Sequence, residues 1–113
     1  MSKITTHVLD VAQGKTAAGI PVSLDIQAPA GNWRSLGHSV TNQDGRITDL
    51  LAAEKLEAGT YRLTFDTSSY LQQNSGNAFF PQVTIVFAVH DASQHYHIPL
   101  LLSPYGYSTY RGS

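Results

Sequence analysis

Apolar and polar residues alternate along much of the chain with a period of two, the pattern of strands that bury one face. The alternation is found at 20–27, 61–65, 83–89, 96–102 and 105–109. Turn sequences that contain glycine, such as Asp44-Gly45 and Ala58-Gly59, separate these runs. Short strands joined by such turns are typical of an all-β protein, so the pattern predicts an antiparallel sandwich or barrel.

Two other windows are candidates for helix. The segment 49–56 consists of good helix formers, but Gly59 limits it to about two turns, and we expect a turn or loop there. The segment 67–74 opens on Thr67, a possible N-cap, and ends before Gly76. We therefore expect one short helix, placed between two strands.

The composition is that of one small folded domain. The 113 residues fit a single domain spanning 1–113, and 42% hydrophobic against 13% charged residues excludes a disordered chain. The formal charge is −1, and the basic residues are spread from Lys3 to Arg111 without a run, which argues against a nucleic-acid partner. The absence of cysteine excludes disulfides, thiolate metal sites and a thiol nucleophile.

The chain lacks the apolar runs of membrane and exported proteins. Its longest apolar stretches are about five residues, whereas a spanning helix needs about 20. The amino terminus has no apolar core of a signal peptide. We expect no membrane partner and a cytoplasmic location, or a periplasmic or peroxisomal one if a targeting segment has been removed.

His95 and His97 share one face of a predicted strand, about 6.5–7 Å apart, opposite the face of Ile98 and Leu100. Three interpretations remain open: two ligands of a zinc site, two histidines on a solvated face, or a catalytic imidazole. No third ligand lies at an obvious spacing, so we expect no metal site.

The other histidines are less distinctive. His7 shares a strand face with Thr5 and Leu9, where a histidine is more often a hydrogen-bonded strand residue than a catalyst. His38 and His90 lie near strand ends, where we expect them to be exposed.

Arg46 follows the turn Asn42–Gly45 at the start of a strand. It is either a surface arginine paired with Asp44 or Asp49, or a clamp for an anion or carbonyl, to which its planar set of donors is suited.

The carboxyl-terminal segment 105–113 is rich in aromatic residues, with three tyrosines, two of them Tyr105 and Tyr110. Chain ends are usually frayed and polar, so we expect an ordered strand against a core edge, a partner subunit or a ligand. Ser108 lacks the Gly-X-Ser-X-Gly elbow of many serine hydrolases, which argues against a nucleophilic serine.

Five segments together resemble the transthyretin-like 5-hydroxyisourate hydrolases of purine catabolism. They are Thr6–Asp10, Gly19–Val22, Thr41–Arg46, Tyr96–Ser108 and the closing tetrapeptide Tyr110–Ser113, which separates these hydrolases from the hormone-carrying transthyretins. The resemblance covers essentially the whole chain.

The resemblance implies a two-sheet antiparallel sandwich of the prealbumin type, assembled as a homotetramer (a dimer of dimers) with active sites in the channel between dimers. It also implies a hydrolase without cofactor or metal, and assigns it to the degradation of urate to allantoin. Its substrate is 5-hydroxyisourate, whose cyclic amide is opened to 2-oxo-4-hydroxy-4-carboxy-5-ureidoimidazoline. The family's catalytic positions fall on His7, Arg46, His97 and Ser108, and its substrate-binding positions on His7, Arg46, Tyr110, Arg111 and Ser113.

The reaction fits these residue types. A neutral imidazole can activate water near pH 7, and a guanidinium can stabilise the oxyanion that develops. We favour His7 as the base, with His97 holding water or substrate. The alternative function is a transthyretin-like carrier of a small ligand, although a carrier of hydrophobic ligands does not require this polar set of side chains.

Overall fold

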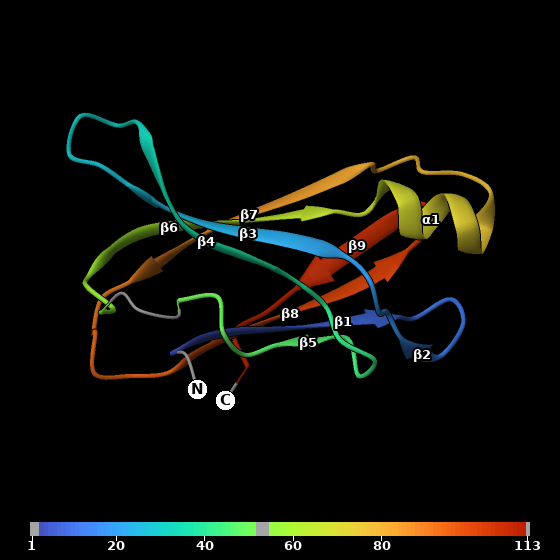
Figure 1. Cartoon of the computed structure of the whole chain (residues 1–113), viewed down its shortest axis with the longest axis horizontal. Coiled ribbons are helices and arrows are strands. Elements are labelled where there is room, and N and C mark those ends of the chain that lie inside the picture. The colour runs from blue at the N-terminus through green and yellow to red at the C-terminus, as the bar shows by residue number, and fades with distance from the viewer. Residues whose placement is uncertain (1–2, 52–54, 113) are drawn as a thin grey trace.

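Two β-sheets pack face to face, and one short helix lies at one end of the sandwich (Figure 1). The computed structural model describes residues 3–51 and 55–112. In chain order the elements are β1 (Ile4–Asp10), β2 (Lys15–Thr16), β3 (Pro21–Gln27), β4 (Trp33–Val40), β5 (Arg46–Ile47), β6 (Gly59–Asp66), α1 (Ser68–Ser75), β7 (Gln82–Val89), β8 (Tyr96–Ser103) and β9 (Gly106–Thr109).

One sheet has the order β2-β1-β8-β9, with β5 also paired to β1, and the other has the order β4-β3-β6-β7. The predicted two-sheet sandwich with one short helix is confirmed. The described pairs are antiparallel except β1–β8, which is parallel from Ile4 opposite Tyr96 to Asp10 opposite Leu102. The antiparallel description is wrong for this one pair, because the chain builds the whole second sheet between the two strands and returns in the same direction.

The alternating runs of the sequence coincide with strands β3, β6, β7, β8 and β9. Strand β4 was not predicted from its sequence. It is an edge strand in which only Trp33, Leu36, Gly37 and Ser39 are partly buried, so it lacks a clear apolar face. The register between β3 and β4 also shifts between Leu24 and Asp25, which interrupts the alternation.

The predicted helix is α1, and it ends as expected at Gly76, whose φ of 73° gives the left-handed C-cap. Thr67 occupies the N-cap position without a capping bond from its side chain; its hydroxyl donates to the Phe80 carbonyl instead. The segment 49–56, expected as a turn or loop, forms a turn at Leu50 and Leu51, and 52–54 lie outside the described residues.

The core lies between the sheets. Leu24, Leu63 and Phe65 from one sheet and Val8 and Leu100 from the other are fully buried. Burial of large apolar side chains, each contributing about 1.5–3 kcal/mol, is the main force that joins the layers. The described residues include no helix long and apolar enough to span a membrane.

The helix is also fastened to the sheet that carries β1. The Tyr70 hydroxyl of α1 donates to Asp10 Oδ2 at 2.7 Å, and both residues are buried. Burial and the neighbouring carboxylate raise the pKa of Tyr70, which therefore stays a hydrogen-bond donor at neutral pH.

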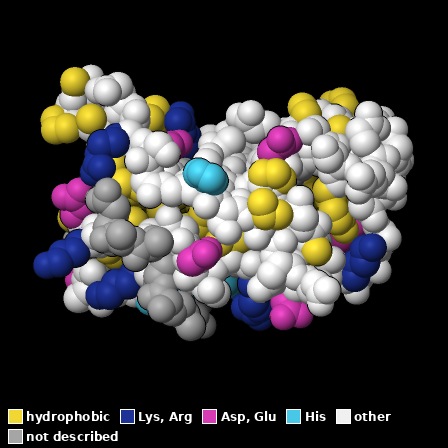
Figure 2. Space-filling view, in the orientation of Figure 1, with side chains coloured by type: hydrophobic (Ala, Val, Ile, Leu, Met, Phe, Trp, Pro, Cys, Tyr) yellow, Lys and Arg dark blue, Asp and Glu magenta, His cyan; other side chains and the backbone are white. Residues whose placement is uncertain are grey.

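Acidic and basic side chains are interspersed on the molecular face shown in Figure 2, and one histidine lies near its centre. This face carries no continuous basic surface of the kind that binds phosphate backbones.

Candidate active site

A polar cluster occupies the outer face of the sheet where β1, β5 and β8 meet. In the strand register, Thr5 of β1 lies opposite His97 of β8, and His7 lies opposite Arg46 of β5. The alternate residues Thr6 and Val8 point into the core and are fully buried. The strand period therefore brings His7, Arg46 and His97, all three predicted from the sequence, to one surface.

The turn before β5 holds Arg46 beside His7. The side-chain oxygen Oδ1 of Asn42 accepts hydrogen bonds from the backbone N–H groups of Asp44 and Arg46, at 2.9 and 3.0 Å. Gly45 has a φ of 73°, and a Cβ there would collide with the carbonyl oxygen of Val8. Only glycine fits this close approach, which is secured by the 2.7 Å hydrogen bond from Val8 N to Gly45 O.

His7 presents a buried ring nitrogen without a partner. Its Nε2 is the one buried side-chain nitrogen or oxygen among the described residues that forms no hydrogen bond. The backbone of Asp44 partly offsets this burial and raises the pKa of His7, as a carbonyl oxygen facing a ring N–H does. Because Nε2 has no partner, Nδ1 is the ring nitrogen on this side, and a proton on Nδ1 leaves the lone pair of neutral His7 on Nε2.

The pKa of His7 lies below its ordinary value of 6.5, first because of burial and second because of the Arg46 guanidinium. The pKa of His97 is lowered too, by burial and then by Arg46, His7 and His95. Both imidazoles are consequently neutral at pH 7.

His97 is held by contacts on two sides. Its Nδ1 lies 2.7 Å from Thr5 Oγ1, and the same hydroxyl lies 3.3 Å from Nε2 of His95. The rings of His95 and His97 stack with centroids 6.5 Å apart, which confirms that they share a face.

The carboxyl-terminal segment passes directly over His97. The Gly112 N–H donates to the His97 carbonyl at 2.7 Å, and a Cβ at Gly112 would lie 2.7 Å from Cδ2 of the imidazole. A larger residue at this position would displace the ring.

Among the described residues, the ion pair that one interpretation of Arg46 requires does not form, and its role as a clamp for an anion or carbonyl stays a prediction. Within the described part of the chain, neither Asp44 nor Asp49 forms an ion pair with it, and its side chain is exposed. The guanidinium is thus available to a ligand on this face.

Ser108 and Tyr110 are farther from the cluster. Ser108 lies opposite Leu101 on β8, four positions from His97, or roughly 13 Å at about 3.3 Å per residue. Within one chain it is therefore out of hydrogen-bonding reach of His97. Its predicted catalytic role and the substrate-binding role of Tyr110, whose side chain is exposed, stay predictions.

Arg111 is directed to a different part of the molecule. Its guanidinium lies 4.4 Å from the centre of the Tyr96 ring and donates to Gln94 Oε1 at 2.7 Å. The guanidinium also donates to the backbone carbonyl of His95 at 3.4 Å, but Tyr96 is buried on the core side of β8, so within one chain the structure does not bring Arg111 to the rings of His7 and His97. Ser113, also predicted to bind substrate, lies outside the described residues.

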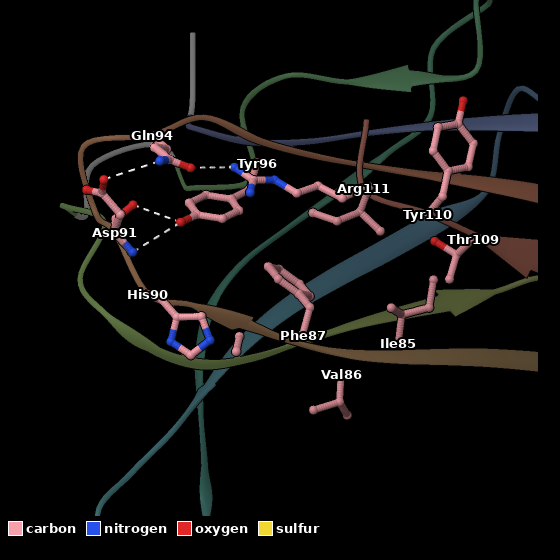
Figure 3. A pocket seen from close by; sticks show the side chains of 12 residues that line it. Ile85, Val86, Phe87, His90, Asp91, Gln94, Tyr96, Thr109, Tyr110 and Arg111 are labelled. Atoms are coloured by element: carbon pink, nitrogen blue, oxygen red, sulfur yellow. Dashed lines mark hydrogen bonds between the residues drawn. The ribbon is translucent and has the colours of Figure 1, made fainter. Parts of the chain in front are cut away.

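Arg111 belongs to a hollow of about 520 Å³ beside β7 and the end of β9 (Figure 3). Ile85 and Phe87 supply much of its apolar lining. Figure 3 shows the Tyr110 ring pointing away from these two residues, whereas Arg111 reaches toward Tyr96. His7, Arg46 and His97 do not line this hollow, so the hollow and the polar cluster are separate features.

The described residues contain no group of three or more histidine, cysteine or acidic side chains placed to hold a metal ion. The zinc interpretation of His95 and His97 therefore has no third ligand within this part of the chain.

Two residues of the site were not identified from the sequence as site residues: Thr5, which contacts His97, and Gly112, which packs on it. Thr5 could have been found, because it is two positions from His7 and so shares its strand face. Gly112 gives no such signal before the path of the terminal segment is known.

Comparison with known proteins agrees with this architecture. The model of the HIUase/Transthyretin family matches residues 4–112. A 5-hydroxyisourate hydrolase of Mus musculus is 45% identical over 113 residues, covering 99% of this chain and 96% of the relative.

Solved structures of both branches of the family share the fold. The 5-hydroxyisourate hydrolase of Klebsiella pneumoniae superposes with a TM-score of 0.84 at 37% identity, covering all of both chains. Sea bream transthyretin in complex with thyroxine gives a TM-score of 0.90 at 29% identity, covering 97% of this chain and 94% of the other. The match extends over nearly every residue, and this chain belongs to the HIUase/Transthyretin family.

Proposed function

We propose that this protein hydrolyses the cyclic amide of 5-hydroxyisourate at the cluster of His7, Arg46 and His97. The observation that carries the proposal is the buried, unpartnered Nε2 of His7 beside an exposed guanidinium. A buried nitrogen without a partner is costly in a purely structural position, and a water molecule or substrate atom would satisfy it. The relatives named 5-hydroxyisourate hydrolase support the choice of substrate.

His7 acts as the general base. Its Nε2 has no partner and, with the ring proton on Nδ1 facing the backbone of Asp44, takes a proton from water as the water oxygen attacks the ring carbonyl. The lowered pKa keeps His7 neutral, and therefore competent as a base, at pH 7. The proton accepted by His7 is then passed to the ring nitrogen when the carbon–nitrogen bond breaks, and the carboxylic acid that forms releases its own proton to solvent to become a carboxylate.

Arg46 stabilises the negative charge that develops on the carbonyl oxygen. The Asn42 turn fixes the backbone of Arg46 opposite His7, from which the guanidinium extends. Donors held in place before the reaction stabilise an oxyanion without reorganisation, an effect worth about 10²–10³ in rate for one donor. His97, also neutral, orients the water or the substrate from the neighbouring strand.

The active form is a homotetramer arranged as a dimer of dimers. Support comes from the openness of the single chain: Arg46 is exposed, and so are Tyr105, Tyr107 and Tyr110. A second copy placed against the outer face would exclude water from the cluster and strengthen its electrostatic interactions. In such an assembly, a neighbouring subunit would supply carboxyl-terminal residues that, within one chain, do not reach the rings of His7 and His97.

A transthyretin-like carrier is the alternative function, favoured by the close superposition on transthyretin bound to thyroxine. The fold is common to both activities, so the side chains must decide between them. A base and a guanidinium aimed at one surface are suited to hydrolysis, and they add nothing to the capture of an apolar ligand.

The test follows the ultraviolet decay of freshly generated 5-hydroxyisourate with and without the protein. We expect decay faster than the spontaneous rate, in proportion to protein concentration. A rate equal to the spontaneous one would contradict hydrolysis and favour the carrier.

A further inference from the structure

One hydroxyl group connects two histidines of the site region. Thr5 Oγ1 lies 2.7 Å from Nδ1 of His97 and 3.3 Å from Nε2 of His95. We propose that Thr5 is a positioning residue that holds the single ring proton of neutral His97 on Nε2, and that His95 orients the Thr5 hydroxyl. The kinetic part of this inference rests on the function proposed above; the position of the proton does not.

The Thr5 hydroxyl has one proton and two ring nitrogens within reach. A threonine hydroxyl has one proton and can donate to only one of the two nitrogens. If both contacts are hydrogen bonds, the other nitrogen must donate to the Thr5 oxygen. The chain of three groups thus has two possible directions, and each direction fixes a different tautomer of His97.

The two distances favour one direction. A contact of 2.7 Å is typical of a hydroxyl donor, whereas 3.3 Å is at the long end for a ring N–H donating to oxygen. Thr5 therefore donates to Nδ1 of His97, and His95 donates from Nε2 to Thr5. With Nδ1 acting as acceptor, the proton of neutral His97 resides on Nε2.

This tautomer complements His7. The buried Nε2 of His7 has no partner, and in the function proposed above it carries the lone pair that accepts a proton. Thr5 leaves His97 with an N–H on Nε2, which can donate to a substrate oxygen or hold the attacking water. The pair then offers one acceptor and one donor, although both residues are neutral histidines.

Both tautomers of neutral His97 are subject to the same surrounding charges. Burial lowers the pKa of His97 most, and the groups that face it, Arg46 of β5, His7 of β1 and His95 just before β8, lower it further. His97 is consequently neutral near pH 7, and the position of its one proton, rather than its charge, is what Thr5 controls.

The first test measures the proton directly. Two-bond ¹H–¹⁵N correlation spectra of histidine-labelled protein distinguish protonated from unprotonated ring nitrogens. We expect His97 to be protonated on Nε2 in the wild type and in Thr5→Ser, which keeps the hydroxyl. In Thr5→Val, which has the same shape but no hydroxyl, we expect a mixture of the two His97 tautomers. Thr109→Val is the matched control, because it removes a 2.6 Å hydroxyl bond on the opposite face of the same sheet. An unchanged His97 spectrum in Thr5→Val, or Nδ1–H in the wild type, overturns the inference.

The second test measures how the kinetic effects of Thr5 and His95 depend on each other. We expect Thr5→Val to lower kcat/KM by about five-fold, which is the effect of losing one hydrogen bond. Thr5→Ser, which keeps the hydroxyl, should have the kcat/KM of the wild type. His95→Leu, at an exposed position that tolerates change, should cost about two-fold and nothing further in the Thr5→Val background, because His95 acts only through Thr5. Independent, multiplying losses would overturn the role of His95. A wild type inactive on 5-hydroxyisourate would refute the proposed function alone, and the nitrogen spectra would still decide where the proton lies.

Discussion

Arg46 lies opposite His7 in the antiparallel register of β5 and β1, and its guanidinium lowers the pKa of that imidazole. The pairing joins two effects in one geometry. Burial is the larger cause of the lowered pKa, and the arginine adds to it in favouring the neutral base; the arginine also places a positive charge where the proposed reaction develops a negative one. Because β5 is only two residues long, this geometry depends on the Asn42–Gly45 turn that precedes it.

Replacement of Arg46 by glutamine should reduce kcat by about 10²-fold or more, because a fixed oxyanion donor is lost. The fold should persist, since the side chain is exposed. Steady-state kinetics check the result, with Arg34→Gln as control for removing an exposed arginine of the other sheet. An increase in KM alone, with kcat unchanged, would reduce the role of Arg46 to substrate capture.

The pH dependence should reflect the lowered pKa of His7. The base must be neutral, so kcat/KM falls on acidification only as the pH passes below 6.5, the ordinary value for histidine. Arg46→Gln removes one cause of the lowering, and the acid limb should move upward toward 6.5 while burial still holds it below. A pH–rate series on both proteins measures this, and an acid limb above 6.5 in the wild type would be inconsistent with the environment of His7.

Activity should require the tetramer. Light scattering should give roughly four times the chain mass of 12.3 kDa, and dilution that dissociates the particle should lower the specific activity in parallel. The physical reason is the exposure of Arg46 and the terminal tyrosines in a single chain. A monomer with full specific activity would refute the requirement.

Hydrolysis should not depend on a metal ion. The proposed steps use imidazole and guanidinium groups only. Protein treated with a chelator and freed of metal should keep its full rate in the decay assay. A large loss that zinc alone restores would instead support His95 and His97 as zinc ligands.

The sandwich was predictable because burial of one strand face imposes a period of two. Strand β8 is a clear case: Tyr96, Ile98, Leu100 and Leu102 are buried, and His97, between the first two of them, is only partly so. Strand β4 escaped prediction because an edge strand with half-exposed faces needs no such period. The parallel pairing of β1 with β8 was not predictable either, since alternation gives the face of each residue but not its neighbour in a distant strand.

In the site, too, the sequence pattern indicates the face of a residue but not its neighbour in another strand. His7, Arg46 and His97 were recognisable by their motifs, yet the link from Thr5 to His97 exists only in the β1–β8 register. For Arg111 the motif and the structure differ. The motif predicts that Arg111 binds substrate, but the alternation of side chains continued beyond β9 places it on the core side of the sheet, over Tyr96.

The most direct test of the whole account compares the decay of freshly generated 5-hydroxyisourate in equal amounts of wild type, His7→Ala, His97→Ala and His38→Ala. His38 is the matched control, since it lies in β4 of the other sheet; His95 would not serve, because it contacts Thr5. With circular dichroism showing that all four are folded, we expect the His7 and His97 variants to lose about 10²-fold or more of the catalysed rate and His38→Ala to match the wild type. A His7→Ala protein as fast as the wild type, or a His38→Ala protein as slow as His7→Ala, would contradict the assignment of the active site.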